Sequence, residues 1–239
     1  MNAQPKVQPL QPNQKVDVAR LRKLVIGRVS VIYVVMGLMF FLPAGTLRYW
    51  EAWAYLAVIA VPMIIFGLYM FKHDPKFIER RMRVKEKREK QKLIIKLGFI
   101  PFLLSFIVPG FDQRFGWSDV SMPLALAGLA MVLLGYLLTL YVFMTNSFAS
   151  RIIEVDKEQK VISTGPYGRV RHPMYSSTIL FYLFTPVALG SYWAVIPALF
   201  IIPVLIIRIL DEEKELLDNL KGYREYLQKV RYRIFPGVW

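Results

Sequence analysis

The 239-residue chain contains no cysteine and only two histidines, His73 and His172. Without cysteine there can be no disulfide, no thiolate metal site and no cysteine nucleophile. Two histidines are too few for a histidine-rich centre, so we expect no metal site. The sequence also lacks a Gly-x-Gly-x-x-Gly turn, which argues against a Rossmann-type cofactor domain.

Charge is missing from long stretches of the chain, although the net charge is +14. The uncharged runs are 29–47, 52–71, 97–111, 120–150 and 173–207. A helix of about 20 apolar residues crosses a hydrocarbon core of about 30 Å. A soluble bundle would show polar residues recurring at helical period inside these runs, and none recur. The pattern predicts an all-α, polytopic membrane protein.

The last uncharged run, 173–207, is too long for one upright membrane helix and gives each of two helices fewer residues than a full span needs. Gly190 and Ser191 lie near its middle, with Pro186 and Pro197 on either side. A single crossing would place the basic C-terminal segment on the opposite side of the membrane from the basic segment before the run. We therefore predict a helical hairpin, 174–189 and 192–207, which brings the number of spans to about six.

Lysine and arginine are concentrated in alternate segments between the runs. Six lie in the N-terminal segment through Arg28, eleven in 72–96, five in 146–175 and seven from Arg208 onward, so that 29 of 31 fall on one side. Basic loops are typical of the cytosolic side. We therefore expect both termini in the cytosol, in a bacterial cytoplasmic membrane, and interpret the charge as topological rather than as a nucleic-acid surface.

These patterns divide the chain into three parts. Residues 1–24 are rich in glutamine and proline, lack the apolar core of a signal peptide and are expected to form a disordered tail. Residues 25–145 are predicted to hold the N-terminal membrane helices, with 72–96 as a basic loop on anionic lipid headgroups. Residues 146–239 are expected to hold a cofactor pocket, because the hairpin brings the polar segments 154–175 and 208–236 to the same membrane face.

Polar residues next to membrane spans indicate a functional site. In the first segment, Ser-Thr-Gly-Pro-Tyr-Gly predicts a turn, and Arg171-His172-Pro173 leads into a helix whose free N–H groups can hold an anion. In the second segment, Arg208 and Glu212 are four residues apart and share a helix face. Taken singly, a histidine before a proline is more typical of a helix cap, and the spacing of Arg208 and Glu212 is more typical of a surface ion pair. Tyr167 and Tyr175 are equally typical of interfacial aromatics.

The order of the motifs resembles that of the isoprenylcysteine carboxyl methyltransferase family, within a broader group that includes membrane phospholipid N-methyltransferases. The ordered set is T-G-P-Y, R-H-P-x-Y, a hairpin, R-x-x-x-E-E-x-x-L, Y-x-x-Y and R-x-x-P, and it covers the chain from Asn146 onward. The family's F-G before the paired tyrosines is altered, since Lys221-Gly222 precedes Tyr223. This departure leaves the path of the last segment and the roles of Arg231 and Arg233 unassigned.

The resemblance implies an enzyme that transfers a methyl group from S-adenosyl-L-methionine to a lipophilic or lipidated acceptor in the membrane, with an isoprenylcysteine-like carboxylate favoured. Matched by motif, the cofactor contacts are Glu154, Gln159, Lys160, Val161, Ile162, Tyr167, His172, Pro173, Met174, Tyr175 and Glu212. Arg208 matches the catalytic arginine that faces the acceptor, and a guanidinium can hold a carboxylate or phosphate in a bidentate contact.

Three other functions stay open on the sequence alone. An amine phospholipid satisfies the same physical constraints, which would make the chain a phospholipid N-methyltransferase. Sterol reductases resemble the chain in having a late hairpin and a cytosolic pocket, which leaves an NADPH-dependent membrane reductase. A non-enzymatic membrane scaffold, whose basic loop recruits lipid or protein, is the third. The sequence gives no prediction of the oligomeric state.

Overall fold

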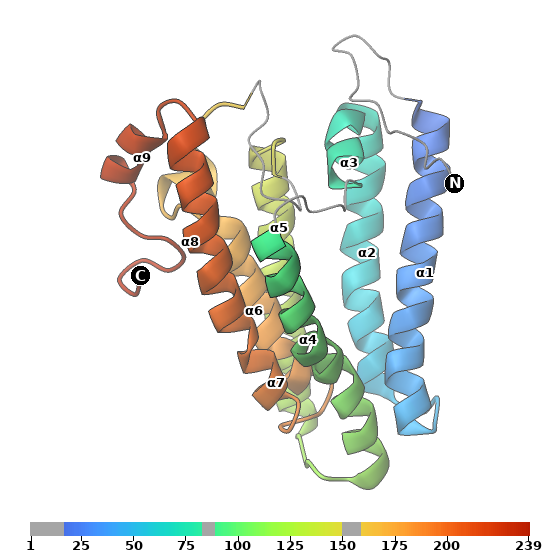
Figure 1. The fold of residues 1–239 in the computed structure, drawn as a ribbon. Helices are drawn as coiled ribbons and strands as arrows, with labels where there is room; N and C mark the ends of the chain where they lie inside the picture. Colours follow the sequence, from blue (N-terminus) through green and yellow to red (C-terminus); the bar gives the residue numbers. More distant parts are fainter. Residues whose placement is uncertain (1–16, 83–88, 150–158) are drawn as a thin grey trace, which may run out of the picture.

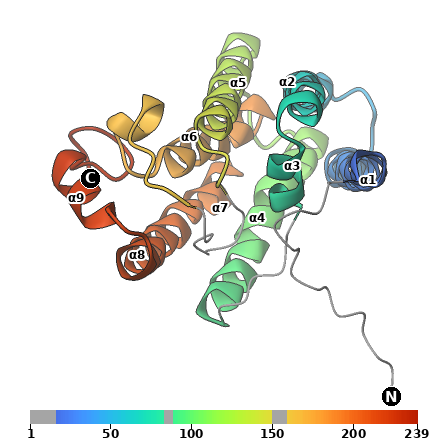
Figure 2. The same cartoon turned by 90° about the horizontal axis from the view of Figure 1, so that it is seen from above.

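The computed structural model describes residues 17–82, 89–149 and 159–239, and every regular element within them is helical. The elements are α1 (Val18–Ala44), α2 (Trp50–His73), α3 (Pro75–Arg81), α4 (Glu89–Phe115), α5 (Met122–Thr145), the 3-10 helix η1 (Gly165–Gly168), α6 (Pro173–Ala188), α7 (Val195–Leu199), α8 (Ile201–Asn219) and α9 (Tyr223–Lys229). In the two views, α1 and α2 lie on one side, α5 to α9 on the other, and α4 between them (Figures 1 and 2).

Four helical segments are long and apolar enough to cross a membrane: Val18–Ala44, Trp50–His73, Leu93–Phe115 and Met122–Thr145. Large apolar side chains on these helices face outward, such as Leu42 at 68% and Leu68 at 69% exposure. Apolar surface of this extent is stable against lipid and costly against water. The prediction of an all-α, polytopic membrane protein is confirmed.

The predicted C-terminal hairpin is present, although its limbs are shorter than full spans. Helix α6 has 16 residues, and the chain turns back after it through Gly190, whose φ of +74° suits glycine. The returning limb is broken at Phe200 into α7 and α8. Pro203 explains the break, because it cannot donate a backbone hydrogen bond to the turn before it. The figure of six spans is therefore approximate: four long helices and a shorter hairpin.

Two boundaries differ from the sequence-based prediction. Helix α1 begins at Val18, before the predicted end of the tail at residue 24, because the Asp17 side chain caps it by accepting from the N–H of Arg20 at 3.0 Å. The predicted basic loop 72–96 contains helix α3 and, from Glu89, the first turns of α4. Charged residues extend these helices before the apolar runs begin, so the runs alone placed the beginnings of α1 and α4 too late in the chain.

Helices α5 and α6 pack with their backbones in contact. A Cβ atom added to Gly128 would lie 2.7 Å from the backbone nitrogen of Ala188, and one added to Gly135 would lie 2.7 Å from that of Phe181. Small residues allow this close approach between membrane helices. Because the two helices run antiparallel, the contact places the end of α5 beside the beginning of α6, where the candidate site lies.

The turn of the hairpin is fixed at the opposite end of the molecule. The buried carboxylate of Asp112 accepts hydrogen bonds from the N–H and hydroxyl of Ser118, each at 2.7 Å, and from the hydroxyl of Ser191. The Tyr49 hydroxyl donates to the carbonyl of Leu189. Helices α2, α4 and α6 are thus joined at their lower ends in Figure 1.

Candidate active site

A pocket lies at the upper end of the molecule in Figure 1, between the residues that follow α5, the segment that leads into α6, and helices α8 and α9. Its volume is about 860 Å³, including the part open to solvent. Its walls are formed by Asn146, Phe148, Ala149, Gln159, Lys160, Val161, Ile162, Tyr167, Arg171, His172, Pro173, Met174, Tyr175, Arg208, Glu212, Glu215, Leu216, Tyr223 and Tyr226.

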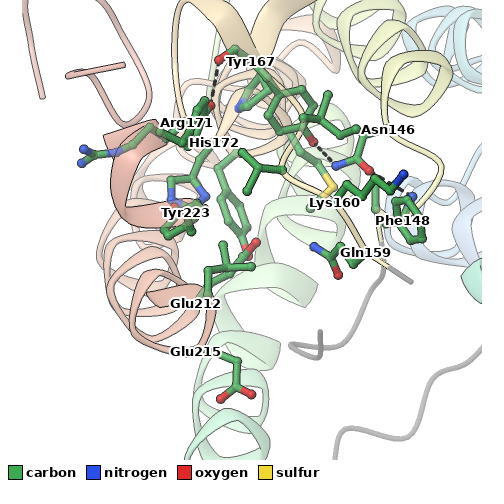
Figure 3. A pocket seen from close by; sticks show the side chains of 18 of the residues that line it. Asn146, Phe148, Gln159, Lys160, Tyr167, Arg171, His172, Glu212, Glu215 and Tyr223 are labelled. Atoms are coloured by element: carbon green, nitrogen blue, oxygen red, sulfur yellow. Dashed lines mark hydrogen bonds between the residues drawn. The ribbon is translucent and has the colours of Figure 1, made fainter. Parts of the chain in front are cut away.

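Eleven of the twelve residues predicted from the sequence line this pocket. They are Gln159, Lys160, Val161, Ile162, Tyr167, His172, Pro173, Met174, Tyr175, Arg208 and Glu212. The twelfth, Glu154, lies outside the residues that the structure describes. Figure 3 shows Gln159, Lys160 and Phe148 on one side of the pocket and Glu212, Tyr223 and His172 on the other. The two segments therefore meet, and the role of each residue stays a prediction.

Helix α8 presents an acidic and a basic side chain to the pocket. Arg208 and Glu212, one turn apart, both line it, as the spacing predicted. The hydroxyl of Tyr175, from the first turn of α6, donates to Oε2 of Glu212 at 2.6 Å, and Arg208 lies close to the same hydroxyl. Such a short bond to a carboxylate is strong and directional. It fixes one face of Glu212 and joins the two limbs of the hairpin.

The next residue, Glu213, does not line the pocket and binds two arginines and a histidine. Its Oε1 lies 2.8 Å from Nε of Arg171 and 3.3 Å from Nε2 of His172, and its Oε2 accepts from Nε of Arg233 at 2.9 Å. The Arg171 contact is an ion pair without the alignment of a hydrogen bond. Glu213 is only 6% exposed. A carboxylate this deeply buried requires such partners.

The partners of Glu213 decide its ionisation. Burial alone would raise the pKa of the Glu213 carboxyl. Hydrogen bonds from His172 and Arg233 and the charges of His172 and Arg171 lower the pKa by a larger amount, so the net shift is downward. An ionised carboxylate can only accept, so Nε2 of His172 carries the hydrogen in this contact. The His172 ring is thereby oriented beside the pocket.

The segment after α9 returns to the hairpin and completes this cluster. The N–H groups of Arg171 and His172 donate to the carbonyls of Tyr232 and Arg233, at 2.9 and 2.8 Å. The Arg233 guanidinium also lies 4.8 Å from the ring centroid of Trp239. Arg231 is exposed. Of the two tail arginines that the sequence left unassigned, Arg233 is the one that joins the site.

A second wall of the pocket includes two residues, Asn146 and Tyr226, that were not predicted from the sequence. Nδ2 of Asn146 donates to the Tyr167 hydroxyl at 3.0 Å, and the Tyr226 hydroxyl donates to the Tyr167 carbonyl at 2.7 Å. Burial raises the pKa of Tyr167 to about 12, so its hydroxyl stays protonated at neutral pH. The resemblance did include the paired tyrosines, but it assigned them no contact. Asn146 follows a long apolar run and carried no motif.

The Tyr223 hydroxyl is buried and has no hydrogen-bond partner in the part of the chain that the structure describes. Burial raises the pKa of Tyr223 above its ordinary range, and the charges of Glu213 and Glu212 raise it by smaller amounts. Buried polar groups are almost always satisfied by protein, water or ligand. Tyr223 lines the pocket, so its free hydroxyl is suited to a bound molecule. Among the described residues there is no cluster of ligands that could hold a metal ion.

Comparison with known proteins bears on this region of the chain. Residues 124–224 match the phospholipid methyltransferase family model. The chain is similar to membrane methyltransferases. The matched range includes nearly all of α5, η1, the hairpin and the beginning of α9, and so most of the pocket. The methyltransferase resemblance inferred from the sequence motifs is confirmed by this match.

The solved structures that are similar include that of the eukaryotic intramembrane Ras methyltransferase ICMT (isoprenylcysteine carboxyl methyltransferase). The two chains share 19% sequence identity, with 90% of this chain and 87% of that chain covered and a TM-score of 0.46. A search among curated proteins found no match.

Proposed function

We propose that this chain is a membrane methyltransferase that uses S-adenosyl-L-methionine to methylate a lipophilic acceptor, with an isoprenylcysteine-like carboxylate as the favoured acceptor. The observation that carries the proposal is the convergence of eleven motif-matched residues on one pocket. The phospholipid methyltransferase match over 124–224 supports the reaction class.

The pocket residues fit this cofactor chemically. S-adenosylmethionine, when bound, supplies a methyl group on a positively charged sulfur. The carboxylates of Glu212 and Glu215 on one wall can hold a cation, and the rings of Phe148, Tyr167 and Tyr223 offer aromatic faces to it. The Tyr223 hydroxyl supplies a donor that none of the described residues uses. Val161 and Ile162 add apolar surface.

Arg208 is suited to hold the acceptor. It lies one turn of α8 before Glu212, toward the apolar part of the hairpin. A guanidinium at this depth can orient a carboxylate or phosphate through two hydrogen bonds. A carboxylate acceptor is already ionised at neutral pH and needs no general base. The protein then has to align the two reactants and exclude water. In the orientation that the basic segments favour, both termini and this pocket are cytosolic.

The test is incubation of the purified protein with methyl-labelled S-adenosylmethionine and a lipid extract, followed by identification of the labelled lipid. Label that is released by alkali indicates a methyl ester and supports a carboxylate acceptor. Alkali-stable label indicates N-methylation of an amine phospholipid, the second candidate, which the name of the matched family favours. No labelled lipid with any extract would count against the proposal.

Binding measurements separate the remaining candidates. Saturable binding of S-adenosylhomocysteine supports the proposal, whereas saturable NADPH binding would favour a reductase, and binding of neither a scaffold. We expect His172→Ala and Glu212→Ala to weaken S-adenosylhomocysteine binding by at least about tenfold, the effect of losing a charge-assisted contact. If both variants bind as the wild type does, the site has been placed in the wrong residues.

A further inference from the structure

The short helix α3 contacts the pocket wall from outside the region that matches the methyltransferase family. Nη1 of Arg80 donates to the carbonyl of Ser147 at 3.1 Å, and the guanidinium lies 4.9 Å from the ring centroid of Phe148. Phe148 lines the pocket. The family match begins at residue 124, so Arg80 belongs to the N-terminal part, to which the proposed function gives no role.

Helix α3 is held firmly enough to position another segment. Asp74 caps it by accepting from the N–H of Phe77 at 3.0 Å, and Pro75 opens the first turn. Phe77 is buried, with its ring centroid 5.4 Å from that of Phe143 on α5. The guanidinium of Arg81 lies 4.4 Å from the same Phe143 ring. Arg81 therefore contacts the end of α5, and Arg80 contacts the turn after it.

A chain of hydrogen bonds connects Phe148 to η1 and to α9. The N–H of Phe148 donates to Oδ1 of Asn146 at 3.0 Å, and Nδ2 of Asn146 donates to the Tyr167 hydroxyl. The carbonyl of Tyr167 accepts from Tyr226 on α9. One amide side chain thus fixes both the wall turn 146–149 and η1. A displacement of Phe148 would therefore also displace Asn146, η1 and the contact between η1 and α9.

We propose that Arg80 is a positioning residue of the pocket: it holds Phe148 and the wall turn 146–149, so that the N-terminal spans set the shape of the cofactor site through α3. The expected effect on ligand affinity rests on the proposed function, whereas the effect on the wall turn does not. The contact combines a hydrogen bond to a carbonyl with a cation over an aromatic ring, and its loss should change the affinity by roughly tenfold.

The first test measures hydrogen–deuterium exchange of the full-length protein in nanodiscs without ligand. In Arg80→Gln, peptides that cover 143–149 and 165–170 should exchange severalfold faster than in the wild type. Lys76→Gln is the matched control, because Lys76 is exposed on the same helix and does not line this pocket. Equal exchange in Arg80→Gln and Lys76→Gln would overturn the positioning role.

The second test measures S-adenosylhomocysteine affinity by calorimetry for the wild type, Arg80→Gln, Phe148→Leu and the double variant. We expect each single change to weaken binding roughly tenfold and the double variant to bind no more weakly than the weaker single, because the two residues act through one contact. Arg80→Lys, which keeps a cation over the ring, should recover part of the affinity. Multiplicative effects would overturn the coupling.

The two tests distinguish the failure of this inference from the failure of the proposed function. If the wild type binds S-adenosylhomocysteine and Arg80→Gln binds equally well, the inference is wrong and the methyltransferase proposal stands. If the wild type binds no S-adenosylhomocysteine, the proposed function fails, and the exchange measurement still decides whether Arg80 positions the wall. Should Arg80→Gln not fold, Arg80→Lys is compared with Lys76→Gln in the same way.

Discussion

Glu213 and Arg233 are joined by a 2.9 Å hydrogen bond between Oε2 and Nε, although twenty residues separate them in the chain. The same carboxylate holds Arg171 and His172, which lie before the hairpin. Three segments that are distant in the sequence therefore meet on one buried side chain. Because the neighbouring Glu212 faces the pocket, Glu213 joins these three segments directly beside the pocket wall.

Replacing Glu213 by Gln should destabilise the fold. The variant leaves the nearly buried Arg171 and the partly exposed Arg233 without their counter-charge, and breaking a buried ion pair from one side costs about 3 kcal/mol. The free energy of unfolding in detergent or nanodiscs measures this. Asp218→Asn makes the same chemical change at an exposed position of α8 and should have little effect. If the two variants are equally stable, Glu213 does not join the segments energetically.

The stability should depend on pH through the same residue. The pKa of Glu213 is lower in the folded protein than its ordinary value of 4.5, so its charged form stabilises the fold above pH 4.5 and this contribution is lost as the pH falls from there through the folded pKa. The difference in unfolding free energy between wild type and Glu213→Gln should shrink as the pH falls below 4.5. A difference that grows in acid would contradict this assignment.

Tyr175→Phe should weaken cofactor binding without unfolding the protein. The change removes only the hydroxyl that donates to Glu212 at 2.6 Å, and a lost hydrogen bond to a carboxylate corresponds to roughly fivefold to tenfold in affinity. Calorimetry with S-adenosylhomocysteine measures the effect. Tyr232→Phe, at an exposed tyrosine near the end of the chain, is the control. Unchanged affinity in Tyr175→Phe would mean that this hydrogen bond does not prepare Glu212 for the ligand.

Arg208→Lys should impair the use of the acceptor more than the binding of the cofactor. Lysine keeps the charge but cannot reproduce a bidentate contact. We expect kcat/KM for the lipid acceptor to fall on the order of tenfold to hundredfold, with S-adenosylhomocysteine affinity within about twofold of the wild type. Arg224→Lys, at an exposed arginine of α9, should leave both quantities unchanged. A parallel loss of both would place Arg208 at the cofactor instead.

The glycines between α5 and α6 should tolerate no side chain. In Gly135→Ala the new Cβ would lie 2.7 Å from the backbone nitrogen of Phe181, so the helices must separate, at a cost of about 2 kcal/mol in unfolding free energy. Gly67→Ala on α2 adds the same methyl group where nothing lies within 4 Å and should be neutral or stabilising. If Gly135→Ala is as stable as Gly67→Ala, the close contact of α5 and α6 is not required.

Much of the helical architecture follows from where the sequence has no charge. The hairpin was predictable because the basic segments on either side of 173–207 have to lie on the same side of the membrane. The beginnings of α1 and α4 were not predictable in this way, because a helix can continue through charged residues outside the lipid. The beginning of α1 is set by the capping residue Asp17 and not by an apolar residue. The break at Phe200 depends on Pro203, one of several prolines in an apolar run, and the run alone does not show which of them interrupts the helix.

The pocket was predictable where motifs mark it and invisible where it depends on tertiary contacts. The resemblance supplied eleven residues that now surround one pocket. Glu213 directly follows Glu212, yet no local pattern shows that a residue twenty positions later returns to it. Arg80 and Phe148 are 68 positions apart, and only the packing of α3 against α5 brings them together.

The shortness of α6 has a consequence for the lipid around the protein. Its 16 residues rise about 24 Å, less than the hydrocarbon core of about 30 Å, whereas the 24 residues of α5 rise about 36 Å. A bilayer accommodates a short apolar segment by thinning locally. We therefore expect the headgroup layer to sink beside the pocket toward Tyr175. An acceptor group at the end of a lipid chain would then reach Arg208 without leaving its leaflet.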